Sequence, residues 1–229
     1  TTGSFNTASG YRSLYSNTTG NYNSAFGFDA LYSNTSGSYN TAIGYKTLTN
    51  NTGNNNFAAG AFSLYFNTTG SGNTATGTNS LFSNTTGLNN SAYGFAALYS
   101  NTTGNHNVAI GDYSLYSNTT AYNNVAIGSS AMQYNTTGGN NTAVGYRAMR
   151  NNTTGYDNVA LGLYALYENT TGYRNVAVGR EALRNNTTGT YNTSSGNEAL
   201  WSNTTGSNNS AFGMESMYAN ETGAWNVAF

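Results

Sequence analysis

Hydrophobic and polar positions recur every seventeen residues from one end of this chain to the other. The repeating unit is G-x-x-N-[STV]-A-x-G-x-x-[AST]-[LM]-x-x-N-T-T, and we number its positions 1 to 17 from the first glycine. The anchor glycines are Gly20, Gly37, Gly53, Gly70, Gly87, Gly104, Gly138, Gly155, Gly172, Gly189, Gly206 and Gly223. Ala121 replaces one anchor, and the unit over 37–52 is one residue short. A fixed period of this length indicates a repeat array, in which each unit packs against its neighbours.

The first half of the unit has the pattern of a short strand. Position 4 is always Asn, position 6 is Ala in every unit except at Ser194, and position 8 is always Gly. Because side chains alternate between the two faces of a strand, positions 6 and 8 share one face, and their small size indicates close packing against it. Positions 5 and 7 vary among Val, Ile, Phe, Tyr, Thr and Ser.

The second half of the unit carries one large apolar residue, at position 12. We expect this column to form the core: Leu14, Leu31, Leu48, Leu64, Leu81, Leu98, Leu115, Met132, Met149, Leu166, Leu183, Leu200 and Met217. A small residue precedes it and an aromatic residue usually follows, which predicts a second short strand or an extended turn. Gly or Asn-Thr-Thr interrupts every apolar stretch before the roughly 12 residues that a helix needs. Two strands and two turns per unit predict an all-β chain, folded as a parallel β-solenoid or β-roll.

The two ends of the array have no distinct capping unit. The chain opens at Thr1 inside a unit and stops at Phe229 soon after another begins, so neither end has the polar cap of a free-standing solenoid. We therefore expect residues 1–229 to be a single uncapped array of about thirteen coils, cut from a longer fibre. One Leu and one Ala per coil make a thin core, which predicts lateral association, most simply as a trimer.

Composition excludes several classes of protein. Only 7% of the residues are charged and the formal net charge is −1, so the chain has no electrostatic footprint for nucleic acid or an anionic membrane. Aromatic residues make up 14%, which together with the strict period argues against disorder. No run of about 18 apolar residues predicts a membrane span, and no charged-then-apolar stretch at the start of the sequence reads as a signal peptide, so we expect the signal of a secreted protein to lie outside this segment. The absence of Cys leaves the redox compartment open.

The Asn-Thr-Thr at the end of each unit matches the N-x-[ST] acceptor of N-linked glycans. Candidate glycosylation sites are Asn17, Asn34, Asn50, Asn67, Asn84, Asn101, Asn118, Asn135, Asn152, Asn169, Asn186, Asn203 and Asn220. In the short unit Asn51 loses the acceptor pattern and Asn50 gains it through Thr52. Asn and Thr also suit tight turns and hydrogen-bonded ladders between coils. Two interpretations therefore stand: a glycosylated fibre, or turn chemistry alone.

An aromatic column at position 13 also has two interpretations. Its rings could bind sugars, or they could form a packing ladder or a subunit contact, which we favour. The column consists of Tyr15, Tyr32, Tyr65, Phe82, Tyr99, Tyr116, Tyr167, Trp201 and Tyr218. Gln133, Arg150 and Arg184 interrupt it, and a continuous binding groove tolerates such breaks poorly.

Nothing in the sequence suggests catalysis, and we expect no catalytic, cofactor-binding or metal-binding residue. His106 is the only histidine and stands at a variable turn position, so neither a Ser-His pair nor a histidine metal site can be built. The acidic residues are dispersed. Position 10 holds Asp29, Glu181, Glu198 and Glu215 in some units and Arg12, Lys46 and Arg147 in others. We expect a column that accepts either sign to be a solvated face.

Two stretches resemble known fibrous proteins. The pattern N-V-A-I-G-x-x-[AS], at Asn107 to Ser114 and at Asn124 to Ala131, resembles the head repeats of trimeric autotransporter adhesins. Asn141 to Gly155 is similar to arrays in phage-type tail fibres and chimeric bacterial fibre proteins. The resemblance implies a left-handed β-roll that forms a homotrimer on a cell or virion surface. The adhesin unit is shorter and lacks the Leu/Met column followed by Asn-Thr-Thr.

We expect from these observations an extracellular structural fibre or fibrous adhesin shaft, with or without a glycan coat, whose partner is chiefly itself. A bacteriophage tail-fibre shaft is the alternative within the same architecture. An ice-binding solenoid is a further alternative, because stacked Thr could form a regular array. Consecutive Thr residues on a strand point to opposite faces, which spoils the plane such a surface needs.

Overall fold

The computed structural model describes residues 2–229, and these form two compact units. The first unit contains the chain up to Tyr113 together with 118–120, and the second contains 114–117 together with 121–229. Each unit is a stack of coils, and each coil contributes one strand. The described residues contain no helix.

The strands are three residues long except the last, which has two. In the first unit they are β1 (Thr7–Ser9), β2 (Ser24–Phe26), β3 (Thr41–Ile43), β4 (Phe57–Ala59), β5 (Thr74–Thr76), β6 (Ser91–Tyr93) and β7 (Val108–Ile110). In the second they are β8 (Val125–Ile127), β9 (Thr142–Val144), β10 (Val159–Leu161), β11 (Val176–Val178), β12 (Thr193–Ser195), β13 (Ser210–Phe212) and β14 (Val227–Ala228).

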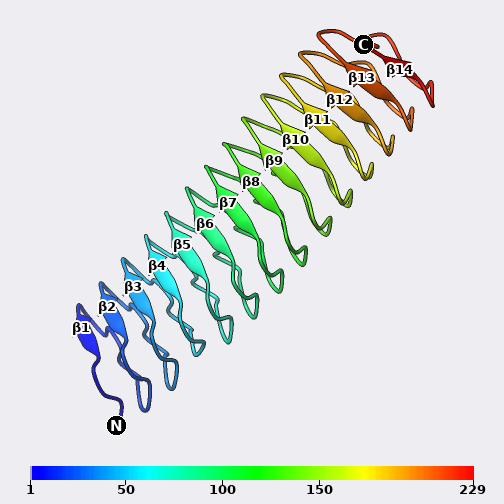
Figure 1. Ribbon diagram of the computed structural model, residues 1–229. Coiled ribbons are helices and arrows are strands. Elements are labelled where there is room, and N and C mark those ends of the chain that lie inside the picture. The colour runs from blue at the N-terminus through cyan, green and yellow to red at the C-terminus, as the bar shows by residue number, and fades with distance from the viewer. Residues whose placement is uncertain (1) are drawn as a thin grey trace. The chain divides into compact units, whose positions relative to one another are not determined.

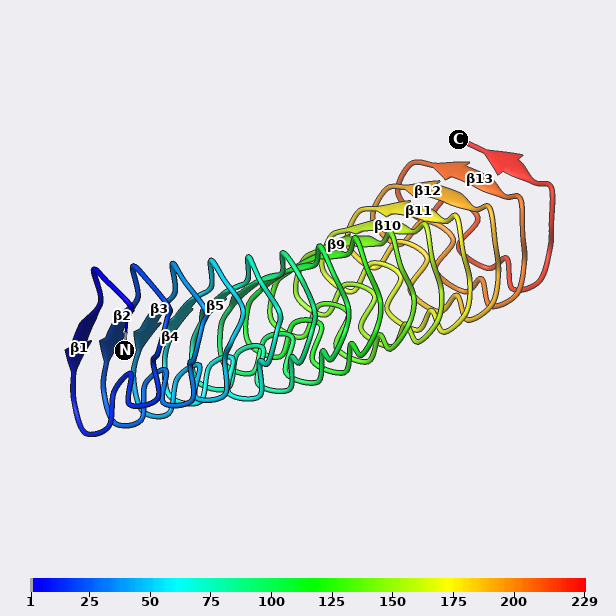
Figure 2. The same ribbon diagram turned by 90° about the horizontal axis from the view of Figure 1, so that it is seen from below.

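Neighbouring strands within each unit pair in parallel and in chain order (Figure 1). The register joins each residue to the one seventeen places on, as in Ala160 with Ala177, except between β3 and β4, where Ala42 pairs with Ala58. The rest of each coil curls round from one strand to the next (Figure 2). The predicted all-β parallel solenoid of 17-residue repeats is thus confirmed.

The second half of the coil is not a strand, and the prediction of two strands per unit is wrong. Positions 9 to 14 form turns, and the Leu/Met residues at position 12 have a φ of +48° to +54°. Bulky residues seldom adopt this left-handed region. Here the conformation is fixed by hydrogen bonds to both neighbouring coils: the Leu31 amide donates to Thr47 O (3.0 Å), and the Asp29 amide to Tyr11 O (2.9 Å). Backbone groups are therefore satisfied without a second strand.

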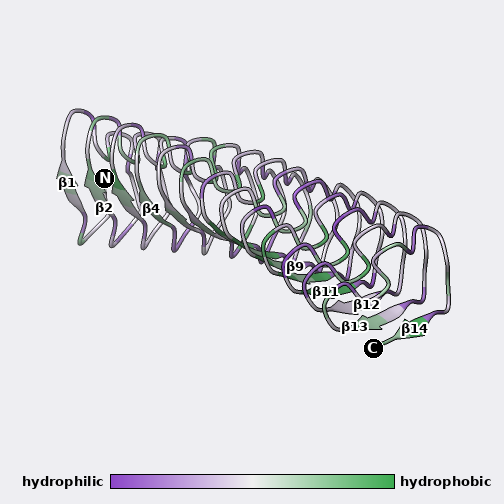
Figure 3. Ribbon diagram, turned by 90° about the horizontal axis from the view of Figure 1, so that it is seen from above, coloured by the Kyte–Doolittle hydropathy of each residue, from purple (hydrophilic) through white to green (hydrophobic). Residues whose placement is uncertain are grey.

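The interior of each coil is narrow. Every Leu and Met of position 12 is fully buried except Leu14 and Met217, which are half-buried. The Ala column of position 6, from Ala25 to Ala211, is also fully buried. Figure 3 shows hydrophobic residues on strands such as β2 and β11 and hydrophilic residues in the turns that join the strands. The strand thus turns its small Ala inward and its residues at positions 5 and 7 outward.

The short coil over 37–52 absorbs its deletion in the turn before Gly53. Asn51 keeps position 15 and donates from Nδ2 to Gly53 O at 2.9 Å. In the preceding coils Asn34 Nδ2 donates to Asn17 Oδ1 at 2.9 Å, but the buried Asn34 Oδ1 has no hydrogen-bond partner. The deletion therefore interrupts a ladder of asparagine side chains at one step.

Inserting a Thr between Thr52 and Gly53 should stabilise the protein. The insertion restores Asn-Thr-Thr and brings Asn51 Nδ2 into reach of Asn34 Oδ1, and satisfying one buried acceptor contributes about 1 kcal/mol. The midpoint of urea unfolding should rise accordingly. A Thr inserted between Thr68 and Thr69, in a coil that is already complete, should lower it. Equal destabilisation by both insertions would show that the short coil is not defective.

Candidate functional site

Two ladders of buried asparagines run from coil to coil in each unit. At position 4, Asn40 donates from Nδ2 to Asn23 Oδ1 (3.2 Å) and to Gly53 O (2.8 Å), and its amide donates to the same Asn23 Oδ1 (3.0 Å). At position 15, Asn152 Nδ2 donates to Asn135 Oδ1 (2.7 Å) and Gly155 O (3.0 Å). Each side chain is held by the coil before it and holds the coil after it.

The position-15 ladder contains all the asparagines that the sequence marks as glycan acceptors except Asn50, which stands at position 14. Those fully buried are Asn34, Asn67, Asn84, Asn101, Asn118, Asn135, Asn152, Asn169, Asn186 and Asn203, while Asn17, Asn50 and Asn220 are half-buried. An N-linked sugar replaces one of the two Nδ2 hydrogens, and in Asn152, for example, both are donated inside the stack. At the fully buried asparagines the geometry therefore favours the interpretation of turn and ladder chemistry over glycosylation.

The sequence itself indicates that the asparagine of position 15 serves the ladder between coils. Asn51 stays at position 15 in the short unit, where it is not itself an N-x-[ST] acceptor, and it still joins the ladder by accepting from Asn67 Nδ2. Selection for glycosylation does not require Asn there, whereas a continuous ladder does.

The two threonines that follow each ladder asparagine differ in their contacts. Thr153, at position 16, donates from Oγ1 to Thr170 O of the next coil at 3.0 Å. Thr154 and Thr171, at position 17, are exposed. The pair lies in a bend outside the strand, so strand alternation does not decide its geometry. The described threonines nevertheless do not form a regular array of paired free hydroxyls, because the hydroxyl at position 16 donates a hydrogen bond to the next coil.

The aromatic residues of position 13 stack face to face along each unit. Ring centroids are 5.6 Å apart for Tyr65 and Phe82 and 5.0 Å for Phe82 and Tyr99, with interplanar angles of 10° and 4°. Trp201 stacks on Tyr218 in the same way, at 5.2 Å. Each ring inside a stack has its faces covered by its neighbours, and these are the faces that a sugar would need. The geometry supports the packing interpretation.

Arg184 does not interrupt the position-13 column, contrary to expectation. Its guanidinium carbon lies 5.6 Å from the Tyr167 ring centroid and 5.7 Å from that of Trp201, so the cation continues the stack between two aromatic rings. Thr49, which is buried, occupies this position between Tyr32 and Tyr65.

The column at position 10 is not uniformly solvated. Asp29 is 4% exposed and receives two hydrogen bonds from Arg12, each of 2.8 Å. The hydrogen bond with Asp29 raises the pKa of the Arg12 guanidinium above its ordinary value. Glu181 is also partly shielded: it pairs with Arg180 at 2.9 Å and accepts from Trp201 Nε1 at 3.1 Å. The expectation of a solvated face is therefore wrong for Asp29.

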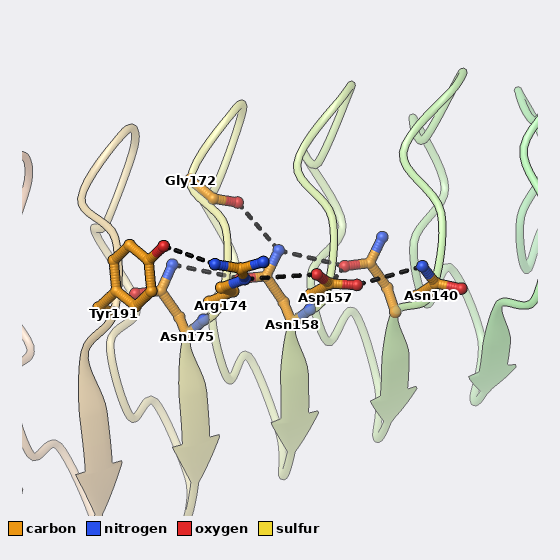
Figure 4. A network of polar contacts seen from close by, with 8 residues as sticks. Asn140, Asp157, Asn158, Gly172, Arg174, Asn175 and Tyr191 are labelled. Carbon is orange, nitrogen blue, oxygen red and sulfur yellow. Dashed lines mark hydrogen bonds and ion pairs between the residues drawn. The ribbon is translucent and has the colours of Figure 1, made fainter.

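A polar chain lies at position 3 of the second unit (Figure 4). Asn140 Nδ2 donates to Asp157 Oδ1 at 3.1 Å, Arg174 Nε lies 3.5 Å from Asp157 Oδ2, and Arg174 Nη1 donates to Tyr191 Oη at 2.6 Å. The hydrogen bond with Tyr191 is the main cause that raises the pKa of Arg174. His106 occupies the same position in the first unit and is exposed.

No pocket is found in the part of the chain that the structure describes, and no three His, Cys, Asp or Glu residues within 2–229 could together hold a metal ion. Among the same residues no helix is long and apolar enough to cross a membrane. No known protein family, curated protein or solved structure matches this chain. The surface columns themselves are therefore the candidate functional features.

Proposed function

We propose that this chain is a structural repeat array of an extracellular fibre or fibrous adhesin shaft, and that its principal partner is a second and third copy of itself. The proposal requires no catalysis and no cofactor. Glycans on the buried asparagines have no part in it, because those amides are used in the ladder.

The observation that supports self-association is the outer face of the strands. Positions 5 and 7 leave apolar side chains partly in water, including Ile110 at 39%, Leu161 at 37% and Val178 at 37% exposed. Phe26, Ile43, Phe57, Ile127, Val176 and Phe212 are exposed to a similar extent on the same face. Contiguous apolar columns of this kind mark interaction surfaces. Three parallel copies could turn this face toward a common threefold axis, which gives a closed cyclic arrangement.

The exposed strand face bears differently on the two alternative functions, a tail-fibre shaft and an ice-binding surface. A bacteriophage tail-fibre shaft uses the same self-association and is separated from an adhesin shaft only by its source. An ice-binding surface needs a flat and regular array, and here Phe26, Tyr93 and Phe212 stand among the Thr and Ser residues of the face. The strand face therefore favours a protein partner over ice.

Light scattering tests the proposed assembly. The wild-type chain should have about three times its 24.1 kDa mass, or a larger multiple. The variant Leu161→Lys with Val178→Lys should be monomeric, because two buried charges would face the partner copies. The matched control Thr171→Lys with Thr188→Lys changes exposed turn residues and should assemble like the wild type. A wild-type monomer that keeps its β-sheet circular dichroism would overturn the proposal.

A further inference from the structure

Most arginines in the chain have a carboxylate partner, and two do not. Arg12 pairs with Asp29, Arg174 with Asp157, and Arg180 and Arg184 with Glu181. Arg147 and Arg150 contact no carboxylate within residues 2–229. Both are half-buried, and both belong to the coil that contains β9. Two uncompensated positive charges in one coil are unusual in a chain with so few charges.

The two arginines lie on one face of the coil. They occupy positions 10 and 13, and side chains at these positions contact each other elsewhere in the second unit. The rings of Tyr164 and Tyr167, at positions 10 and 13 of the next coil, are 5.3 Å apart, and the Arg184 guanidinium at position 13 lies 5.9 Å from the Tyr164 ring. Columns 10 and 13 are therefore neighbours, and Arg147 and Arg150 occupy these two columns in the same coil.

Arg150 is held in place by neutral groups. Its Nε donates to Gln133 Oε1 (2.9 Å), its Nη1 to Tyr167 Oη (3.2 Å) and its Nη2 to Tyr134 Oη (3.1 Å). These contacts use three of the five N–H donors of the guanidinium and leave two. They orient the group without cancelling its charge, which is the condition for presenting it to an anion.

Arg147 has an unsatisfied donor. Its Nε is buried and makes no hydrogen bond, and the contact of its guanidinium is with the face of the Tyr146 ring, 4.9 Å from the ring centroid. An acceptor from solvent cannot reach this buried Nε, but the Nη1 and Nη2 groups of Arg147 are not buried and make no hydrogen bond either, so their four N–H donors remain for an anion supplied from outside.

We propose that Arg147 and Arg150 form a binding site for the oxyanion of an acidic polysaccharide, either a sulfate or a carboxylate. The planar guanidinium fork matches both anions. Without a pocket, a lone ion would have few contacts, whereas a sugar polymer can also rest on the flanking rings of Tyr134 and Tyr146, each 41% exposed. The site does not depend on the proposed assembly, because positions 10 and 13 lie outside the strand face.

Calorimetric titration of the full chain tests this site with dextran sulfate, polygalacturonate, neutral dextran and inorganic sulfate. At least one charged polymer should bind about 10-fold or more tightly than dextran and inorganic sulfate, and the affinity should fall with salt. Arg147→Gln with Arg150→Gln should weaken that binding about 10-fold or more. The control Arg180→Gln removes an arginine that has a carboxylate partner and should change affinity by no more than about twofold.

Each outcome decides the question. Binding of the sulfated polymer alone, the carboxylated polymer alone or both supports the site and identifies the anion. Absence of binding, equal binding by the double variant, or inorganic sulfate binding as tightly as the polymers would overturn it. Circular dichroism verifies the fold of each variant. Light scattering on the same samples reports assembly, so a monomer that binds would count against the proposed fibre and not against this site.

Discussion

Leu98→Asp is expected to unfold the coils around it, with loss of β-sheet circular dichroism or aggregation. Leu98 is fully buried in the narrow interior and has a φ of +52°. The substitution removes a buried apolar side chain and introduces a carboxylate with no partner, which together cost about 4 kcal/mol or more. Because each coil contacts only its neighbours, the loss of one coil also removes the support of the coils on either side.

Leu88→Asp is the matched control for this prediction. Leu88 lies at position 2 of the same coil and is 41% exposed, so the same change of residue should alter the free energy of unfolding by no more than about 0.5 kcal/mol. Urea unfolding followed by circular dichroism measures both variants. If the two variants were equally stable, the position-12 column would not be the core.

Gly162→Ala is expected to destabilise the second unit by about 3 kcal/mol or more. Gly162 has a φ of +140°, which only glycine adopts readily, and an added Cβ would lie 2.6 Å from the carbonyl carbon of Gly179 in the next coil. The next coil cannot move away, because it is packed just as closely against the one after it: a Cβ added to Gly179 would lie 2.7 Å from the carbonyl carbon of Gly196. The strain is therefore passed along the stack.

Gly139→Ala separates this effect from a general cost of replacing glycine. Gly139 has no positive φ, and its added Cβ would lie 3.2 Å from Tyr122 O, a contact that small shifts can relieve. Other units have Ser, Asn, Tyr, Thr, Leu or Ala at this position. The control should stay within about 0.5 kcal/mol of the wild type. A Gly162→Ala variant of unchanged stability would show that the coils can separate locally.

Much of the fold could be predicted from the repeat itself. The alternation around Ala at position 6 and Gly at position 8 identifies the strand, and the invariant apolar residue at position 12 identifies the buried column, as at Leu166. These features depend on residue size and on the period of a strand, which are visible in any single unit.

The conformation of the second half could not be predicted in the same way. Leu166 and its equivalents adopt a left-handed backbone that their residue type disfavours, and hydrogen bonds to adjacent coils impose it. This left-handed conformation is therefore determined by the stacking of the coils and not by the local sequence. For the same reason the sequence left two interpretations of Asn152 open, glycan acceptor or ladder residue, since its ladder contacts exist only between coils.

The offset of seventeen residues in nearly every contact has a genetic consequence. Each coil offers to the next the same donors and acceptors that it receives from the one before, as Asn169 does between Asn152 and Asn186. Insertion or deletion of one whole repeat in the gene would add or remove a coil, and the junction would recreate contacts already present elsewhere in the stack. A change in the number of coils would therefore alter the length of the array without requiring new kinds of contact between coils.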